Sequence, residues 1–220
     1  LFHGASGSGK EATAIQFATL LNCGQANDMP CFKCSSCRKF NSLQHPNLSL
    51  VIPLPRENAI AKNDLPIKAL SSKTLEILTD QLGQKGKDPY IKLQLPRAQQ
   101  ILINSIREIR EKVYLKAVVP GWKIILIFQS EKLMLQQGES ANALLKILEE
   151  PPEGTTLILC TEYHDRLSET IRSRCQSIFF PSVSEYEIVS HLQNECNTPE
   201  DEAFLIAHLS PVSYTHLRAH

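Results

Sequence analysis

Eight residues near the start of the chain have the types and spacing of a loop that binds phosphate groups. The run Gly4-Ala5-Ser6-Gly7-Ser8-Gly9-Lys10-Glu11 follows the pattern G-x-x-x-x-G-K, but Glu11 stands where a Ser or Thr is usual. In such a loop backbone N–H groups surround the α- and β-phosphates, the lysine reaches the β- and γ-phosphates, and the final hydroxyl binds Mg²⁺. The residues predicted to bind a nucleotide are Gly4, Gly7, Gly9 and Lys10.

The last position of this motif weakens the prediction that ATP and Mg²⁺ bind. A carboxylate roughly 4 Å from a phosphate charge repels it by about 4 kcal/mol at an effective dielectric constant near 20. A working P-loop ATPase also needs acidic residues at the end of a neighbouring strand. After the apolar run 124–127 the chain has Phe128 and Gln129, and the nearest acid is Glu131. Two magnesium contacts are therefore missing, although the backbone of the loop is still specified.

Four cysteines within fifteen residues have the spacing of a metal site. Cys23, Cys31, Cys34 and Cys37 follow the pattern C-x7-C-x2-C-x2-C. In a chain expected to lie in the cytosol, such a cluster favours metal over disulfides. Four thiolates complete a tetrahedral Zn²⁺ site without an open position, which predicts a structural zinc. His45 is a competing ligand, although a capping or packing role before Pro46 is the simpler interpretation.

A third motif, Ser173-Arg174-Cys175, precedes the last short apolar run. On spacing alone, Arg174 is most simply a surface residue that forms salt bridges. An always-charged, forked guanidinium at the edge between a helix and a strand is nevertheless suited to reach a phosphate on another subunit.

These motifs must be positioned by alternating strands and helices. Apolar runs predict strands over 48–52, 123–128, 156–161 and 177–180. Helical periodicity predicts helices over 9–21, over 102–113 with Asn104 or Ser105 as N-cap, and over 141–148, which Pro151-Pro152 must end. Such alternation predicts an α/β fold with a mainly parallel sheet. Only Leu1-Phe2-His3 precede the loop, too few for the usual preceding strand, so we expect a chain cut short at its front.

The remaining segments suggest the division of the chain. We expect a nucleotide-binding-like domain over 1–181, with a zinc knuckle over 23–37. Within it, an insertion over about 53–96 should be a partly helical excursion on the surface, with a Lys/Gly-rich turn at 83–87. A capped helix at Ser184 should open a small helical lid domain over 182–210. Residues 211–220 break the helical pattern and are expected to be a non-native tail.

Composition narrows the class of protein. The chain has 220 residues, is 42% hydrophobic, and has 23 basic and 23 acidic side chains. Balanced charge excludes bulk electrostatic attraction as a reason to bind nucleic acid. No apolar run approaches the roughly 18 residues that span a bilayer. We therefore expect a cytoplasmic protein without a membrane partner.

Taken together, the motifs resemble one family. The phosphate loop, the cysteine knuckle, His45-Pro46, the run Ser140-Ala141-Asn142-Ala143-Leu144-Leu145-Lys146-Ile147-Leu148-Glu149-Glu150-Pro151-Pro152 and Ser173-Arg174-Cys175 are similar to those of the clamp-loader subunits of bacterial DNA polymerase III, AAA+ proteins of DNA replication. The resemblance extends over about 1–209. Loss of the magnesium contacts, with the knuckle and arginine kept, is most similar to the delta-prime branch.

The resemblance implies roles that the residues alone do not establish. It implies that Arg174 is an arginine finger acting in trans on the γ-phosphate of ATP held by an adjacent subunit, and that Thr161 is near the position of a γ-phosphate sensor. The chain would be a stator in a hetero-oligomeric ring with gamma/tau and delta subunits. That ring loads the sliding clamp on primer-template DNA as part of a DNA-directed DNA polymerase holoenzyme, a nucleotidyltransferase complex. Alternatives are an ATP-hydrolysing gamma/tau-like motor using Glu11 or Glu131, and a P-loop phosphotransferase.

Overall fold

Five parallel strands form one sheet in the order β2-β3-β4-β1-β5. This computed structural model describes residues 1–134, 139–196 and 198–209. The strands are β1 (Phe2–Gly4), β2 (Leu48–Val51), β3 (Lys123–Ile127), β4 (Thr155–Thr161) and β5 (Ile178–Phe180). The predicted α/β fold with a parallel sheet is confirmed.

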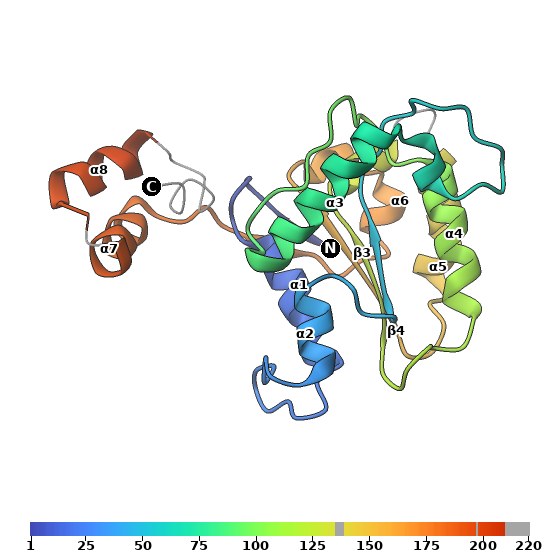
Figure 1. The fold of residues 1–220 in the computed structure, drawn as a ribbon, viewed down its shortest axis with the longest axis horizontal. Coiled ribbons are helices and arrows are strands. Elements are labelled where there is room, and N and C mark those ends of the chain that lie inside the picture. Colours follow the sequence, from blue (N-terminus) through green and yellow to red (C-terminus); the bar gives the residue numbers. More distant parts are fainter. Residues whose placement is uncertain (135–138, 197, 210–220) are drawn as a thin grey trace.

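Helices cover both faces of the sheet (Figure 1). The helices described are α1 (Lys10–Leu21), α2 (Ser35–Asn41), α3 (Ser72–Lys87), α4 (Ile103–Tyr114), α5 (Glu139–Glu149) and α6 (Glu169–Arg172), and, after the sheet, α7 (Glu185–Cys196) and α8 (Glu200–Leu209). Short 3₁₀ turns lie at Pro66–Ala69, Ser130–Met134 and His164–Arg166. Helices α1 and α3 lie on one side of the sheet, whereas α4 and α5 lie on the other.

Alternate residues of the strands supply two separate hydrophobic cores. Ile124 and Leu126 of β3 join α1 and α3 in one cluster, whereas Ile125 and Ile127 join α4 and α5 in the other. This alternation follows from the two-residue period of a strand. Because both faces are covered, β3 and β4 each contain an unbroken apolar run, at 124–127 and 157–160, as buried parallel strands usually do.

The prediction that too few residues precede the loop to form a strand is wrong. Phe2 pairs with Cys160 of β4 and with Ile178 of β5, so β1 lies between two neighbours. Three residues are enough here because hydrogen bonds form along both of its edges. The strand therefore leads directly into the phosphate loop, as the motif requires.

The prediction that residues 53–96 form a surface excursion is also wrong in part. Leu54, Leu78 and Leu93 from this segment are buried in the same cluster as α1 and β3. The expected turn at 83–87 is instead the last part of α3. A Cβ on Gly86 would lie 3.1 Å from Cα of Ser42, so this glycine allows α3 to pack closely on the chain after α2.

Helix α4 begins without the predicted side-chain cap. Its N-cap is Leu102, which makes no side-chain capping bond. Asn104 instead donates from Nδ2 to the carbonyl oxygens of Ala61 (2.9 Å) and Asp64 (2.8 Å). A residue suited to capping is thus used to fix the insertion to α4.

The last two helices pack on each other. Ile188 and Leu192 of α7 and Ala203 and Ala207 of α8 belong to a third hydrophobic cluster, and the pair stands apart from the sheet in Figure 1. Ser184 caps α7 as predicted, because its Oγ accepts from the Glu187 N–H while Glu187 accepts from the Ser184 N–H. The predicted non-native tail, 211–220, lies outside the described residues.

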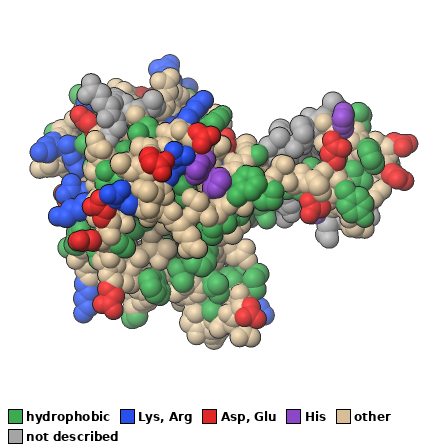
Figure 2. Space-filling model, turned by 180° about the vertical axis from the view of Figure 1, so that it is seen from behind, with side chains coloured by type: hydrophobic (Ala, Val, Ile, Leu, Met, Phe, Trp, Pro, Cys, Tyr) green, Lys and Arg blue, Asp and Glu red, His purple; other side chains and the backbone are tan. Residues whose placement is uncertain are grey.

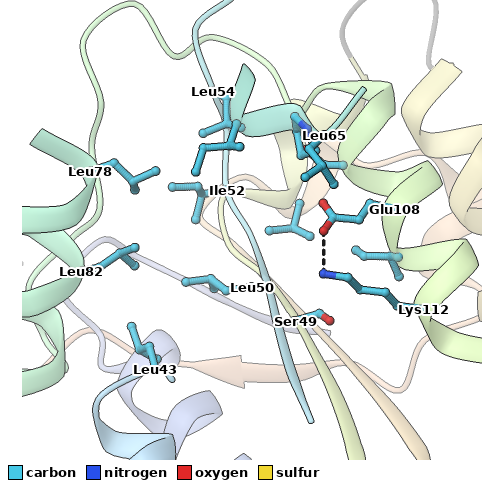
Figure 3. A pocket seen from close by; sticks show the side chains of 15 residues that line it. Leu43, Ser49, Leu50, Ile52, Leu54, Leu65, Leu78, Leu82, Glu108 and Lys112 are labelled. Atoms are coloured by element: carbon cyan, nitrogen blue, oxygen red, sulfur yellow. Dashed lines mark ion pairs between the residues drawn. The ribbon is translucent and has the colours of Figure 1, made fainter. Parts of the chain in front are cut away.

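An apolar groove of about 300 Å³ lies beside the edge strand β2 (Figure 3). Side chains from β2 and the chain after it, including Leu50 and Ile52, face Leu78 and Leu82 of α3. The ion pair between Lys112 and Glu108 of α4, 2.6 Å long, closes one side.

Candidate functional site

The phosphate loop, residues 4–11, is built around glycines with backbone conformations that other residues adopt with strain. Gly7 and Gly9 have φ of 75° and 82°. Gly4 has φ of 155°, and a Cβ there would lie 2.1 Å from the carbonyl oxygen of Phe180 on β5. The structure brings the predicted glycines together with Lys10 at the start of α1.

Lys10 is turned toward the loop itself. Its Nζ donates to the carbonyl oxygen of Ala5 at 2.8 Å and lies 4.0 Å from Oε1 of Glu162. The residue is only 5% exposed, and burial lowers the pKa of its ammonium, with the charge of Glu162 acting in the opposite direction. The lysine that would meet a β- or γ-phosphate thus makes contacts within the chain.

Glu11 forms an ion pair with a lysine from the insertion. Nζ of Lys85 lies 2.8 Å from Oε2 of Glu11 and also donates to the carbonyl oxygens of Pro89 (3.1 Å) and Ile91 (2.7 Å). An ammonium has three donors, and all three are used. The Lys85 side chain is fully buried, with its Nζ 5.1 Å from the centre of the Phe128 ring. The acidic residue in the loop is therefore neutralised by the chain's own cation.

The segment after α3 covers the loop. The hollow that remains has a volume of about 60 Å³ and is lined by Ser6, Gly7, Gly9, Lys10, Glu11, Ala12, Pro89, Tyr90, Lys92 and Glu162. This is room for a few water molecules directly over the loop. The ring of Tyr90 lies 3.7 Å from the position of a Cβ on Gly9. Lys92 and Glu162 form an ion pair of 2.7 Å at the rim.

The ends of β3 and β4 are polar but lack the paired acids of an ATPase. Gln129 donates to the carbonyl oxygen of Leu93 at 2.8 Å. Thr161, predicted to lie near the position of a γ-phosphate sensor, is 1% exposed and donates to Oε2 of Glu131 at 2.6 Å. Its hydroxyl also accepts from the N–H of Tyr163. The Thr161 hydroxyl thus both donates and accepts a hydrogen bond within the chain.

The four predicted cysteine ligands lie together. Their sulfur atoms are all within 4.8 Å of one another, and those of Cys31 and Cys37 are 3.8 Å apart. A tetrahedral ion bound at about 2.3 Å from each sulfur separates the sulfurs by about 3.8 Å. Backbone N–H groups of Cys31, Cys34 and Cys37 donate to the sulfurs of Cys23, Cys31 and Cys34. The cluster fits a metal ion.

Backbone hydrogen bonds and burial shift the pKa values of two of these thiols in opposite directions. N–H groups at Cys34 and Lys33 lower the pKa of the Cys31 thiol to about 6, whereas burial raises that of Cys37 to about 12. His45 is not arranged as a ligand: its Nδ1 accepts from the Asn47 N–H, its Nε2 lies 3.2 Å from Ser36 Oγ, and its ring stacks on Phe40. Its interpretation as a packing residue is confirmed.

Arg174 lies elsewhere, just after α6. Its guanidinium contacts Glu149 at the end of α5 and the carbonyl oxygen of Thr170. Among the described residues, the hydrogen bonds and ion pairs of Arg174 join it to α5 and α6, and none joins it to the phosphate loop. The predicted finger and the predicted nucleotide residues therefore form separate sites.

Sequence reasoning missed Lys85, Tyr90, Lys92 and Glu162 as parts of the loop's surroundings. One signal was present for Lys85, since Leu78, Leu82 and Lys85 follow helical spacing and place this lysine on the apolar face of α3. No local pattern could pair it with Glu11, which lies 74 residues earlier.

Comparisons with known proteins agree on one family. The family model described as "DNA polymerase III, delta subunit" matches residues 1–184. Subunit delta' of Bacillus subtilis is 28% identical over 200 residues, which cover 90% of this chain and 46% of the relative. Subunit tau of that organism is 30% identical over 193 residues, covering 87% and 26%. Subunit delta' of Escherichia coli is 33% identical over 132 residues, covering 59% and 39%.

The chain spans less than half the length of each of these relatives. Within the described residues, no helix combines the length and the apolar character needed to cross a bilayer. The family model covers far more than half of the chain. The chain therefore belongs to the clamp-loader subunits of DNA polymerase III, and within them it is most like delta-prime.

Proposed function

We propose that this chain is a delta-prime-like stator, a clamp-loader subunit that does not hydrolyse ATP and that supplies Arg174 to ATP bound by a neighbouring subunit. The observation that carries the proposal is the state of the phosphate loop. Its backbone is complete, but Lys10 and Glu11 are already paired with the Ala5 carbonyl oxygen and with Lys85, and Pro89 and Tyr90 line the space over it. A loop of this kind is suited to a structural role.

The proposed partners are the gamma/tau and delta subunits, the sliding clamp, and primer-template DNA reached through the complex. Zero net charge and the interspersed basic and acidic side chains of the face in Figure 2 favour contact with DNA through the assembly over strong binding by this chain alone. We further propose that the four cysteines bind a structural Zn²⁺, which needs no open coordination position. Helices α7 and α8 would begin the lid domain.

The test uses the full-length protein assembled with its partner subunits. We expect Arg174→Ala to leave assembly intact and to lower DNA-stimulated ATP turnover, since removing an arginine finger costs about 10³-fold or more in GTPases. Arg172→Ala is the matched control. Arg172 lies two residues before Arg174, and its guanidinium forms an ion pair with Glu169 of the same helix. Turnover unchanged by Arg174→Ala would refute the stator role.

A gamma/tau-like motor is the second candidate, favoured by the complete glycine frame of the loop. ATP titrations of the full-length protein with and without Mg²⁺ separate the two. A motor requires Mg²⁺-dependent binding and a turnover that Lys10→Ala abolishes. A stator should show neither.

A further inference from the structure

The side chain of Arg174 is held at a defined place by its neighbours in the chain. Ile171 before it is fully buried, and Cys175 after it packs against the core that α4 and α5 share. The backbone N–H groups of Arg174 and Cys175 donate to the carbonyl oxygens of Ile171 and Arg172. The backbone at Arg174 is thus fixed, whereas its side chain extends from this turn and is about one third exposed.

Glu149 binds one edge of this guanidinium. Its Oε1 accepts from Nε of Arg174 at 2.8 Å and lies 2.7 Å from Nη2. Nη1 donates to the carbonyl oxygen of Thr170 at 2.8 Å. A guanidinium has five N–H donors. These three contacts therefore fix its plane and leave two donors, one on each terminal nitrogen, for another acceptor.

The position of Glu149 on α5 gives a physical reason for its pairing with Arg174. Glu149 is the last residue of α5, which is anchored by the fully buried Leu144 and Ile147 and is followed by Pro151-Pro152. A negative side chain at the C-terminal end of a helix is unfavourable next to the helix dipole. The guanidinium of Arg174 offsets that cost, because it meets the carboxylate at the same end of the helix.

We propose that Glu149 is a positioning residue for Arg174, which it orients so that the two remaining donors face the phosphate of a neighbouring subunit. This inference rests on the proposed stator function and gives Glu149, the first residue of the Glu-Glu-Pro-Pro run, a role in it. Arginine has about 2 kcal/mol of rotamer entropy, and prior orientation reduces what is lost when the transition state forms. Removing Glu149 should therefore lower kcat and leave the KM for ATP unchanged.

The experiment measures DNA-stimulated ATP turnover of the complex assembled with full-length variants. An exposed ion pair contributes a factor of up to about five, and misplacement by 1 Å costs about a hundredfold. We expect Glu149→Ala to lower kcat by roughly tenfold. Glu149→Gln keeps an acceptor oxygen and should restore kcat to within about threefold of the parent. Glu150→Ala is the control, since Glu150 makes no ion pair among the described residues.

Each outcome bears on a separate claim. If Arg174→Ala lowers turnover but Glu149→Ala behaves like Glu150→Ala, the stator function stands and the positioning role of Glu149 is overturned. A rise in turnover with Glu149→Ala would also overturn it, because the carboxylate would then hold the arginine back. If Arg174→Ala has no effect, the proposed function fails and this inference fails with it. Co-purification of the subunits checks that assembly is unchanged.

Discussion

Replacement of Lys85 by methionine should destabilise the chain strongly. The substitution keeps most of the apolar stem but removes an ammonium that is fully buried and that has three acceptors. Removing one partner of a buried ion pair costs about 3–5 kcal/mol, because the other charge is left uncompensated. The Glu11 side chain is 16% exposed and can still recruit some water. We therefore expect Lys85→Met to lower the free energy of unfolding by about 3 kcal/mol.

A double-mutant cycle separates the ion pair from the packing of the stem. Glu11→Gln alone should also destabilise, because it leaves a buried ammonium without its counter-charge. The variant with both changes should recover part of the loss, with a coupling energy of at least about 1.5 kcal/mol. Urea unfolding followed by the fluorescence of Trp122, the one tryptophan of the chain, measures all four proteins.

Two results would refute this reasoning about the loop. A loss below about 1 kcal/mol for Lys85→Met would place the pair among ordinary surface ion pairs. Additivity of the two changes within about 0.5 kcal/mol would show that Lys85 and Glu11 do not interact. Either result would remove the main physical reason for regarding the loop as filled by the chain itself.

Two further predictions concern the knuckle and its support. Cys34→Ser should abolish the binding of one Zn²⁺ per chain and lower the melting temperature by roughly 10 °C or more. Cys175→Ser, outside the cluster, is the control and should keep the zinc. Equal zinc content in the two variants would contradict the proposed ligands. Burial, with a smaller effect of Lys39, lowers the pKa of His45 in the folded chain. As the pH falls, the unfolded chain therefore binds this proton first. The contribution of His45 to the free energy of unfolding is present above about pH 6.5 and is lost as the pH falls toward the folded pKa. His45→Gln, measured by urea unfolding in zinc-buffered solution between pH 7.5 and 5.5, should flatten this slope, and an unchanged slope would show that His45 is not the group responsible.

The structure could be predicted from the sequence where a short run of residues favours a single local conformation. The glycine frame, the cysteine spacing and the apolar runs of β3 and β4 each specify a structure through neighbouring residues, and all three are present in the fold. The residues 83–87 were misread because glycine and lysine are typical of turns, whereas here Gly86 allows close helix packing and Lys85 reaches Glu11. Both functions depend on partners far away in the sequence.

The same limit applies to the start of the sheet. A run of three residues is too short to indicate a strand by periodicity. Phe2 nevertheless lies between β4 and β5, and hydrogen bonds on both sides compensate for its short length. The position of the strand is decided by tertiary pairing, which a local reading of residues 1–3 does not contain.

The replacement of a hydroxyl by Glu11 is best understood together with the segment that covers it. A carboxylate in an open phosphate loop would repel a nucleotide and would stay solvated. Here the chain places a buried ammonium against it and covers the loop with Pro89 and Tyr90. The guanidinium of Arg174, by contrast, keeps two donors directed away from its own ion pair. Because the loop's charges are paired within the chain and the guanidinium keeps two unused donors, we propose that Arg174, and not the loop, is the group of this chain that would bind a phosphate.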